Sequence, residues 1–390
     1  MATNLLPTGH PSHDSRQVLT ALEDGRARTL ALVGNLSDEQ LERVYSPIMS
    51  PLVWDLGHIA AYEDLWLAHR QGGLELLRGD LAELYDAFET PRAVRGQIDA
   101  LGPAAAREYL RAVRARSVEL ISDARAGDAN ICEMVVRHEL QHSETMRQTL
   151  AIAGLLSSAD QARADEPLDG LDGSPDWVQI PAGEFEMGSP GAGFAYDNER
   201  PRHAVELAAF AIARRPVSSR SWMQFSEAGG YERPEWWSQE GWAWKQEQRI
   251  SQHPAIAASN PQAPACHVSW YEAEAFATAH EARLPSEAEW ERAATLPAPA
   301  GGTGRPPRRA RALEAVGRVW EWTRSSFGGY PGFVAHPYRE YSEVFFGDRY
   351  RVLRGGSWAT DARVANPRFR NWDLPQRRQI FAGLRLARAA

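Results

Sequence analysis

The sequence predicts an α+β protein of two domains, a helical bundle followed by a tryptophan-rich domain with many loops. The chain of 390 residues exceeds one typical domain and can bury a sizeable core. Of its fourteen tryptophans, only Trp54 and Trp66 precede residue 170, so the two parts differ in composition. Residues 157–176 are polar, acidic and interrupted by glycine and proline, as in a linker. We therefore expect one domain over residues 1–160 and another over 174–390.

The first domain has the periodicity of helices. Four segments carry apolar residues three or four positions apart, which is the spacing of one buried helix face. They are residues 14–35, 51–70, 104–126 and 129–155. Together they predict a four-helix bundle. Residues 72–103 form a long connection across this bundle, and long connections often carry function.

Capping signals mark the starts of these helices. Ser50 followed by Pro51 is typical of an N-cap with proline at the first helical position. Ser37 and Gln40 have the spacing of a capping box, and Asp128 can cap the last helix.

The second domain consists of short aromatic segments separated by glycine and proline. Helical spacing predicts helices over residues 270–282 and 286–294. Little regular period follows, so we expect irregular loops held by buried aromatic rings. Residues 297–311 have the composition of a flexible loop with solvated arginines.

Composition and charge exclude several classes of protein. A formal net charge of −8 provides no basic excess for binding nucleic acid. No apolar run reaches the roughly eighteen residues of a membrane span, and the start of the chain does not resemble an export signal, so we expect a cytoplasmic protein without a membrane partner. Cys132 and Cys266 are the only cysteines and lie far apart in sequence. Because they form neither a disulfide framework nor a CxxC motif, any sulfur chemistry must use sulfur from a substrate.

Two histidines lie on the inward face of the last bundle helix. His138 and His142 continue an apolar stripe, and at about 100° per residue their directions differ by only about 40°. This is the spacing with which one helix offers two imidazoles to one metal ion. Glu144 lies about 200° from His142 and should point away, whereas Gln141 is about 60° from His138 and could border the site. The rest of the stripe is Ile131, Val135, Met146 and Leu150.

His58, in an apolar helix of the same bundle, is the best candidate for a third ligand. Alone it would more often be a hydrogen-bonded core residue. Three imidazoles on core faces favour a metal site, because each would otherwise lose hydration without gaining a partner. Zinc and iron(II) both suit three neutral imidazoles. Zinc would activate a bound water or thiolate and iron(II) would support oxidative coupling with dioxygen, and the composition leaves both open.

Several longer motifs carry a resemblance to a known family. HELQHSETMRQ in the bundle and GRVWEWT, PYREYSEVFF, YRVLRGGSWAT and FRNWDLPQRRQIFAGLRLAR near the end resemble the sulfoxide synthases of ergothioneine biosynthesis, especially the mycobacterial type. The related selenoneine synthases belong to the same wider family. The resemblance spans nearly the whole chain. It implies a DinB-like four-helix bundle followed by a formylglycine-generating-enzyme-like domain of the C-type-lectin class.

The resemblance also implies roles for individual residues. His58, His138 and His142 match the iron-binding histidines of the family. Gln141, Asn371 and Trp372 match positions that hold hercynine, which is trimethylated histidine. Amides can orient an imidazole by hydrogen bonds, and an indole face can contact a quaternary ammonium group.

The donor of sulfur or selenium has its own matching positions. Arg92, Arg95, Asp373 and Arg377 match the part of the family site that holds γ-glutamylcysteine. Guanidinium groups suit its carboxylates, and a carboxylate suits its ammonium group. A selenosugar is the family's alternative donor, and the sequence leaves the choice between the two open.

Tyr338 and Tyr341 match the tyrosine region that supplies a proton or hydrogen atom during oxidation, and Tyr338 ranks first. The stretch between Tyr341 and Arg354 is a few residues shorter than in the mycobacterial type. Because formylglycine generation uses a cysteine pair, and Cys266 is the only cysteine of the second domain, that activity is excluded.

The resemblance therefore implies iron(II)-dependent and dioxygen-dependent formation of a C–S or C–Se bond at the imidazole C2 of hercynine. Two other functions remain open. One is a zinc-dependent thiol transferase of the DinB type, and the other is a noncatalytic, lectin-like binding protein. The sequence does not predict an oligomeric state.

Overall fold

The computed structural model describes residues 12–390 except 124–127, 169–174, 192, 254–259 and 297–312. The chain divides into two compact units, Met1–Leu156 and Ser157–Ala390. The loop predicted at 297–311 lies outside the described residues. No helix in the described part of the chain is long and apolar enough to cross a membrane.

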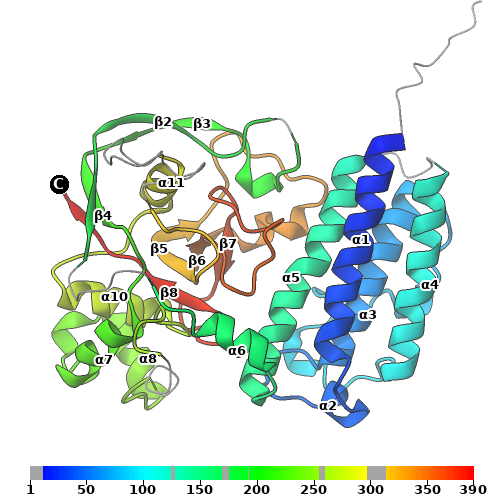
Figure 1. Cartoon of the computed structure of the whole chain (residues 1–390), viewed down its shortest axis with the longest axis horizontal. Coiled ribbons are helices and arrows are strands. Elements are labelled where there is room, and N and C mark those ends of the chain that lie inside the picture. The colour runs from blue at the N-terminus through cyan, green and yellow to red at the C-terminus, as the bar shows by residue number, and fades with distance from the viewer. Residues whose placement is uncertain (1–11, 124–127, 169–174, 192, 254–259, 297–312) are drawn as a thin grey trace, which may run out of the picture. The chain divides into compact units, whose positions relative to one another are not determined.

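The first unit is the predicted four-helix bundle (Figure 1). Its long helices are α1 (Ser12–Val33), α3 (Leu52–Glu63), α4 (Pro103–Ser122) and α5 (Ala129–Ala153). α1 packs along α5, and α3 packs against both α4 and α5. α3 continues as a π-helix, η1 (Asp64–Gln71), so the predicted segment 51–70 is helical almost throughout. The connection 72–103 contains only two short 3-10 turns, η2 (Gly79–Leu81) and η3 (Arg92–Val94).

Two of the three predicted caps are confirmed. Ser37 and Gln40 form a capping box at the short helix α2 (Asp38–Glu42), and the Asp128 side chain accepts from the backbone N–H of Asn130 at the start of α5. The prediction for Ser50 is wrong. α3 begins one residue later, with Pro51 at the N-cap, because the Ser50 hydroxyl accepts a hydrogen bond from Arg95 instead.

A buried ion cluster joins the four helices of the bundle. Arg26 of α1 and Arg114 of α4 each bind both Glu63 of α3 and Glu139 of α5, with N–O distances of 2.7–3.0 Å. Burial raises the pKa of the Glu63 carboxyl, but the two guanidinium charges outweigh it and hold this pKa below its usual value. Because each helix contributes one member, the cluster fixes how the helices face one another.

The second unit contains three small sheets. The largest has the strand order β7-β6-β5-β8, in which β5 pairs antiparallel with β6 and parallel with β8. The second, β1-β4-β9, is antiparallel, and β2 pairs with β3. The strands are β1 (Trp177–Ile180), β2 (Gly183–Met187), β3 (His203–Leu207), β4 (Phe210–Ala213), β5 (Trp320–Phe327), β6 (Gly347–Arg354), β7 (Asn371–Asp373), β8 (Ala382–Leu384) and β9 (Ala387–Ala389).

Helices lie on two sides of these sheets (Figure 1). The two predicted helices are confirmed as α10 (Trp270–Ala279) and α11 (Glu287–Thr295). α6 (Ser158–Ala164), α7 (Ser219–Glu227) and α8 (Gln239–Glu247) were not predicted. The first part of the predicted linker is therefore helical, because the Ser157 side chain caps α6 by accepting from the N–H of Asp160.

After residue 294, β5 and β6 have eight residues each and β7, β8 and β9 have three each, and loops and turns make up most of the other described residues, as expected. The expected aromatic core is present, and Trp222, Trp290 and Trp322 are fully buried. Buried ion pairs add to this core in a way that the sequence did not predict. Three fully buried arginines each bind a glutamate of a neighbouring element, in the pairs Arg354–Glu291, Arg370–Glu287 and Arg385–Glu321.

Candidate metal centre

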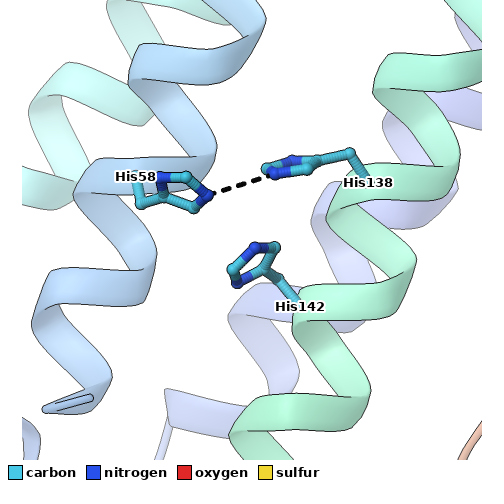
Figure 2. Close-up of side chains that lie close together, drawn as sticks. All are labelled: His58, His138 and His142. Atoms are coloured by element: carbon cyan, nitrogen blue, oxygen red, sulfur yellow. Dashed lines mark hydrogen bonds between the residues drawn. The ribbon is translucent and has the colours of Figure 1, made fainter. Parts of the chain in front are cut away.

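Three histidines of the bundle converge on one point. His58 comes from the middle of α3, and His138 and His142 come from successive turns of α5 (Figure 2). One ring nitrogen from each lies within 4.8 Å of the others, and Nε2 of His58 is 3.1 Å from Nε2 of His138. Among the described residues this is the only group of histidine, cysteine and carboxylate side chains with the spacing of a metal site.

A different neighbour orients each ring. Nδ1 of His58 donates to the backbone oxygen of Tyr85 at 2.7 Å, which leaves the lone pair of Nε2 directed at the other histidines. Nδ1 of His142 lies 3.1 Å from Oδ1 of Asp55 and donates to this carboxylate. The His138 ring stacks on Tyr62, with ring centroids 3.6 Å apart. The two hydrogen-bond acceptors fix the tautomers of His58 and His142, and the stacking on Tyr62 fixes the plane of the His138 ring.

The protonation of the rings also suits a metal ligand. Burial, followed by the neighbouring His142, lowers the pKa of both His58 and His138 well below the ordinary histidine value. Both rings are therefore neutral at pH 7, which is the form that binds metals. Three imidazole nitrogen donors, two of them oriented through Nδ1, fit zinc or iron(II).

Other predicted residues of the bundle lie around this group. Gln141 is half-buried on α5, next to His142 in sequence. Glu144 is buried but does not belong to the three-histidine group, as the helix geometry predicted. Asp55 and Tyr62, which contact His142 and His138, were not predicted from the sequence. The available signal was their spacing, because they stand three residues before and four residues after His58 on the same helix.

The two arginines of the connection differ in environment. Arg92 is exposed, and its Nη1 lies 3.4 Å from the backbone oxygen of Ile48. Arg95 is buried, and its guanidinium carbon lies 3.6 Å from the centroid of the Trp54 ring, which stacks on His58. Burial lowers the pKa of Arg95 to about 10, although the nearby Asp55 opposes this shift. Arg95 also donates hydrogen bonds to the backbone oxygens of Thr90 and Ala87 and to the Ser50 hydroxyl.

The remaining predicted residues lie in the second unit. Asn371, Trp372 and Asp373 form β7, and the Trp372 ring stacks on Phe327 with centroids 4.1 Å apart. Oδ1 of Asn371 accepts from the backbone N–H of Trp372. Nε of Arg377 lies 3.7 Å from Oδ1 of Asp373.

The two tyrosines share one loop. Tyr338 and Tyr341 contact each other edge to face, with ring centroids 6.2 Å apart. Tyr341 also meets the Trp372 ring edge to face at 5.9 Å. The second unit therefore brings Tyr338, Tyr341 and Trp372 into one cluster, while the first unit brings the three histidines together.

Comparisons with known proteins match both units. Residues 21–146 match the DinB superfamily, and residues 169–306 and 309–390 match the sulfatase-modifying factor enzyme 1-like domain. The hercynine oxygenase of Mycobacterium tuberculosis is 39% identical over 95% of this chain and 98% of its own length. The hercynine oxygenase of Mycolicibacterium smegmatis is 38% identical over 93% of this chain and 96% of its own length. The formylglycine-generating enzyme of Thermomonospora curvata is 35% identical, but the match covers only 30% of this chain and 48% of that protein.

Proposed function

The chain belongs to the family of the hercynine oxygenases, and from this membership we propose that it is an iron(II)-dependent enzyme that oxidatively joins sulfur or selenium to hercynine. The bond forms at the imidazole C2 of hercynine, and dioxygen is the oxidant. The product would lead toward ergothioneine for a sulfur donor and toward selenoneine for a selenium donor.

The observation that carries the proposal is the convergence of three imidazoles on one point. His58, His138 and His142 would hold the ion, with Tyr85 and Asp55 keeping hydrogen on the outer nitrogens of two of them. When bound there, iron(II) would supply the redox chemistry that dioxygen requires. Three ligands also leave coordination positions open, as a catalytic metal site needs.

The reaction balances without a further reductant. One hercynine, one donor thiol and one dioxygen give one sulfoxide and one water. The C2–H and S–H bonds break, and a C2–S and an S–O bond form. The second oxygen atom leaves as water with the two hydrogens. The coupling and the oxidation of sulfur each supply one electron pair to dioxygen, and a selenol balances in the same way.

The protein's own residues would bind and orient hercynine. The amides of Gln141 and Asn371 suit hydrogen bonds to its imidazole ring, and the Trp372 face suits its trimethylammonium group. The Phe327 ring covers one face of Trp372, so the indole is held in a fixed plane.

The donor would be bound mainly by charge. Arg92 and Arg377 suit the carboxylates of γ-glutamylcysteine, and Asp373 suits its ammonium group. Arg95 donates hydrogen bonds from three of its five N–H groups to Thr90, Ser50 and Ala87. Its other two N–H groups would bind the sulfur or selenium substrate. Tyr338, or Tyr341 beside it, would deliver a proton during oxidation.

The test is anaerobic loading of the protein with iron(II), followed by measurement of oxygen uptake and mass spectrometry of the products. Hercynine is supplied with either γ-glutamylcysteine or a selenosugar, and zinc-loaded protein is the matched control. We expect oxygen uptake and a hercynine adduct only with iron. If the zinc protein transfers a thiol and consumes no oxygen, the oxidative function is wrong. If neither form changes hercynine, the chain is not a hercynine enzyme.

A further inference from the structure

We infer that Asp197 is a positioning residue for the tyrosine loop, defined as residues 336–342, which carries Tyr338 and Tyr341. The inference rests on the proposed function, because the loop matters for catalysis only if its tyrosines act there. Asp197 begins η4 (Asp197–Glu199), which is far from the loop in sequence. It would act through the loop and contact no substrate.

The Asp197 carboxylate binds both ends of the tyrosine loop. Its Oδ1 accepts from the Ser342 hydroxyl at 2.6 Å, and its Oδ2 accepts from the backbone N–H of His336 at 3.3 Å. Oδ1 also accepts from the N–H of Asn198 at 2.7 Å, which fixes the carboxylate on its own backbone. A single side chain therefore fixes the beginning and the end of the loop.

Burial strengthens these contacts. Asp197 is 4% exposed and Ser342 is 0% exposed, so water does not compete for the bond between them. Hydrogen bonds to a charged group in such surroundings are stronger than those between neutral groups at the surface. Loss of the carboxylate would also leave the Ser342 hydroxyl buried without its acceptor.

The residue before Asp197 holds the ring of one tyrosine directly. Tyr196 is buried, and its ring stacks on Tyr341 with centroids 4.2 Å apart and planes 10° from parallel. Tyr341 is thus held between Tyr196 on its face and Trp372 at its edge. Adjacent residues therefore fix both the backbone of the loop and one of its rings.

The residue after Asp197 anchors the strand that carries Trp372. The backbone oxygen of Asn198 accepts from Nη1 of Arg370 at 2.6 Å, and Arg370 immediately precedes β7. Residues 196–198 therefore bind both the tyrosine loop and the start of β7. This arrangement sets the distance between the tyrosines and β7, which carries Asn371 and Trp372.

Misplaced tyrosines should lower kcat, while the residues that bind the sulfur or selenium substrate stay in place. In the iron-loaded enzyme, Asp197→Ala should lower kcat by about 10- to 100-fold, because shifts of about 1 Å can cost that much. The KM for the donor should change by no more than about twofold, since no donor contact is lost. Asp197→Asn should restore part of kcat, because its amide oxygen can still accept from Ser342.

The experiment combines these kinetics with hydrogen exchange of the substrate-free protein. Peptides covering residues 336–346 should exchange faster in Asp197→Ala than in the unaltered protein. Asp348→Ala is the matched control, because Asp348 also accepts from a serine hydroxyl, that of Ser326 at 3.0 Å, but lies outside the loop. If Asp197→Ala does not fold, Ser342→Ala replaces it and should show the same exchange and kcat effects.

Two results would overturn the inference. One is unchanged exchange of residues 336–346, and the other is a loss of kcat no larger than that of Asp348→Ala. Failure of the proposed function looks different, because the unaltered iron-loaded protein would then leave hercynine unchanged. The exchange measurement uses no substrate, so it tests the positioning of the loop in either case.

Discussion

His142 and Asp55 form an imidazole–carboxylate pair beside the three-histidine group, with Nδ1 of His142 3.1 Å from Oδ1 of Asp55. Asp55 is 1% exposed, and its Oδ2 has no hydrogen-bond partner among the described residues. Because the carboxylate can only accept, the hydrogen of His142 lies on Nδ1 and the lone pair on Nε2. Asp55 thus selects the tautomer that can bind a metal ion.

Asp55→Asn should weaken metal binding without removing a ligand. Its amide can turn an N–H group toward Nδ1 and favour the wrong tautomer of His142. Loss of such a partner typically costs 10- to 100-fold in affinity, so we expect the dissociation constant for iron(II) or cobalt(II) to rise by about this factor. Anaerobic titration of the metal-free protein measures it. Asp80→Asn, at an exposed ion pair with Arg78, is the control. Equal affinities of the two variants would contradict the assigned role.

His142→Ala removes a ligand and should have the larger effect. Iron retention after gel filtration should be lost, while the helical circular dichroism signal stays unchanged because the ring is at the edge of the core, with 20% of the side chain exposed. Metal analysis of the purified variant provides the measurement. Iron content equal to that of the unaltered protein would remove His142 from the ligand set.

The stability of the metal-free protein should fall as the pH drops below about 6.5. His58 and His138 have lowered pKa values in the folded state, so the unfolded chain takes up protons at a higher pH than the folded chain. Their contribution to stability is complete above the unfolded pKa of about 6.5 and is lost as the pH falls toward the folded pKa. His267, whose pKa burial lowers to about 4, adds an effect of the same sign.

Thermal unfolding between pH 7.5 and 5 measures this dependence. The double variant His58→Gln, His138→Gln should show a flatter decline of Tm with falling pH than the unaltered protein. His69→Gln, which changes an exposed histidine, should leave the slope unchanged. An equally steep decline in the double variant would show that these two rings are not the source.

The histidine group could be predicted because it depends on helix periodicity. The positions of His138 and His142 follow from one turn of α5, and His58 lies on an apolar helix of the same bundle. The partner of His58 could not be predicted, because it is the backbone oxygen of Tyr85 in the irregular connection. Ser50 shows the same limit, since a buried arginine distant in sequence uses the hydroxyl that local rules assign to a helix cap.

The second unit was harder to predict for a different reason. β7, β8 and β9 each contain only three residues, too few for an alternating pattern to show. Their positions depend partly on buried Arg–Glu pairs such as Arg385–Glu321, which joins β5 to the residue after β8. Charged residues normally indicate a solvated surface, so their pattern in the sequence points away from a core.

Glu63→Gln should destabilise the bundle strongly. The change leaves Arg26 and Arg114 buried with one carboxylate fewer, and breaking a buried ion pair typically costs about 3–5 kcal/mol. Urea unfolding monitored by helical circular dichroism measures the change in the free energy of unfolding. Glu108→Gln, in an exposed pair with Arg111, is the control and should cost less than about 1 kcal/mol. Similar losses in both variants would mean that the cluster contributes little.

Arg377→Ala should chiefly weaken binding of the donor. Arg377 and Asp373 lie side by side, and 20% of each side chain is exposed. Both side chains are therefore accessible to a ligand. A hydrogen bond to a charged group contributes about 1.5–3 kcal/mol, so the KM for γ-glutamylcysteine should rise by roughly 10- to 100-fold. Because this contact is equal in the ground and transition states, kcat should change little.

Arg377→Lys should recover only part of the affinity, since an ammonium group cannot bind a carboxylate in bidentate fashion. Steady-state kinetics with each substrate varied separately provides the measurement, with Arg349→Ala as an exposed control. A rise in the KM for hercynine alone would place Arg377 at the other substrate.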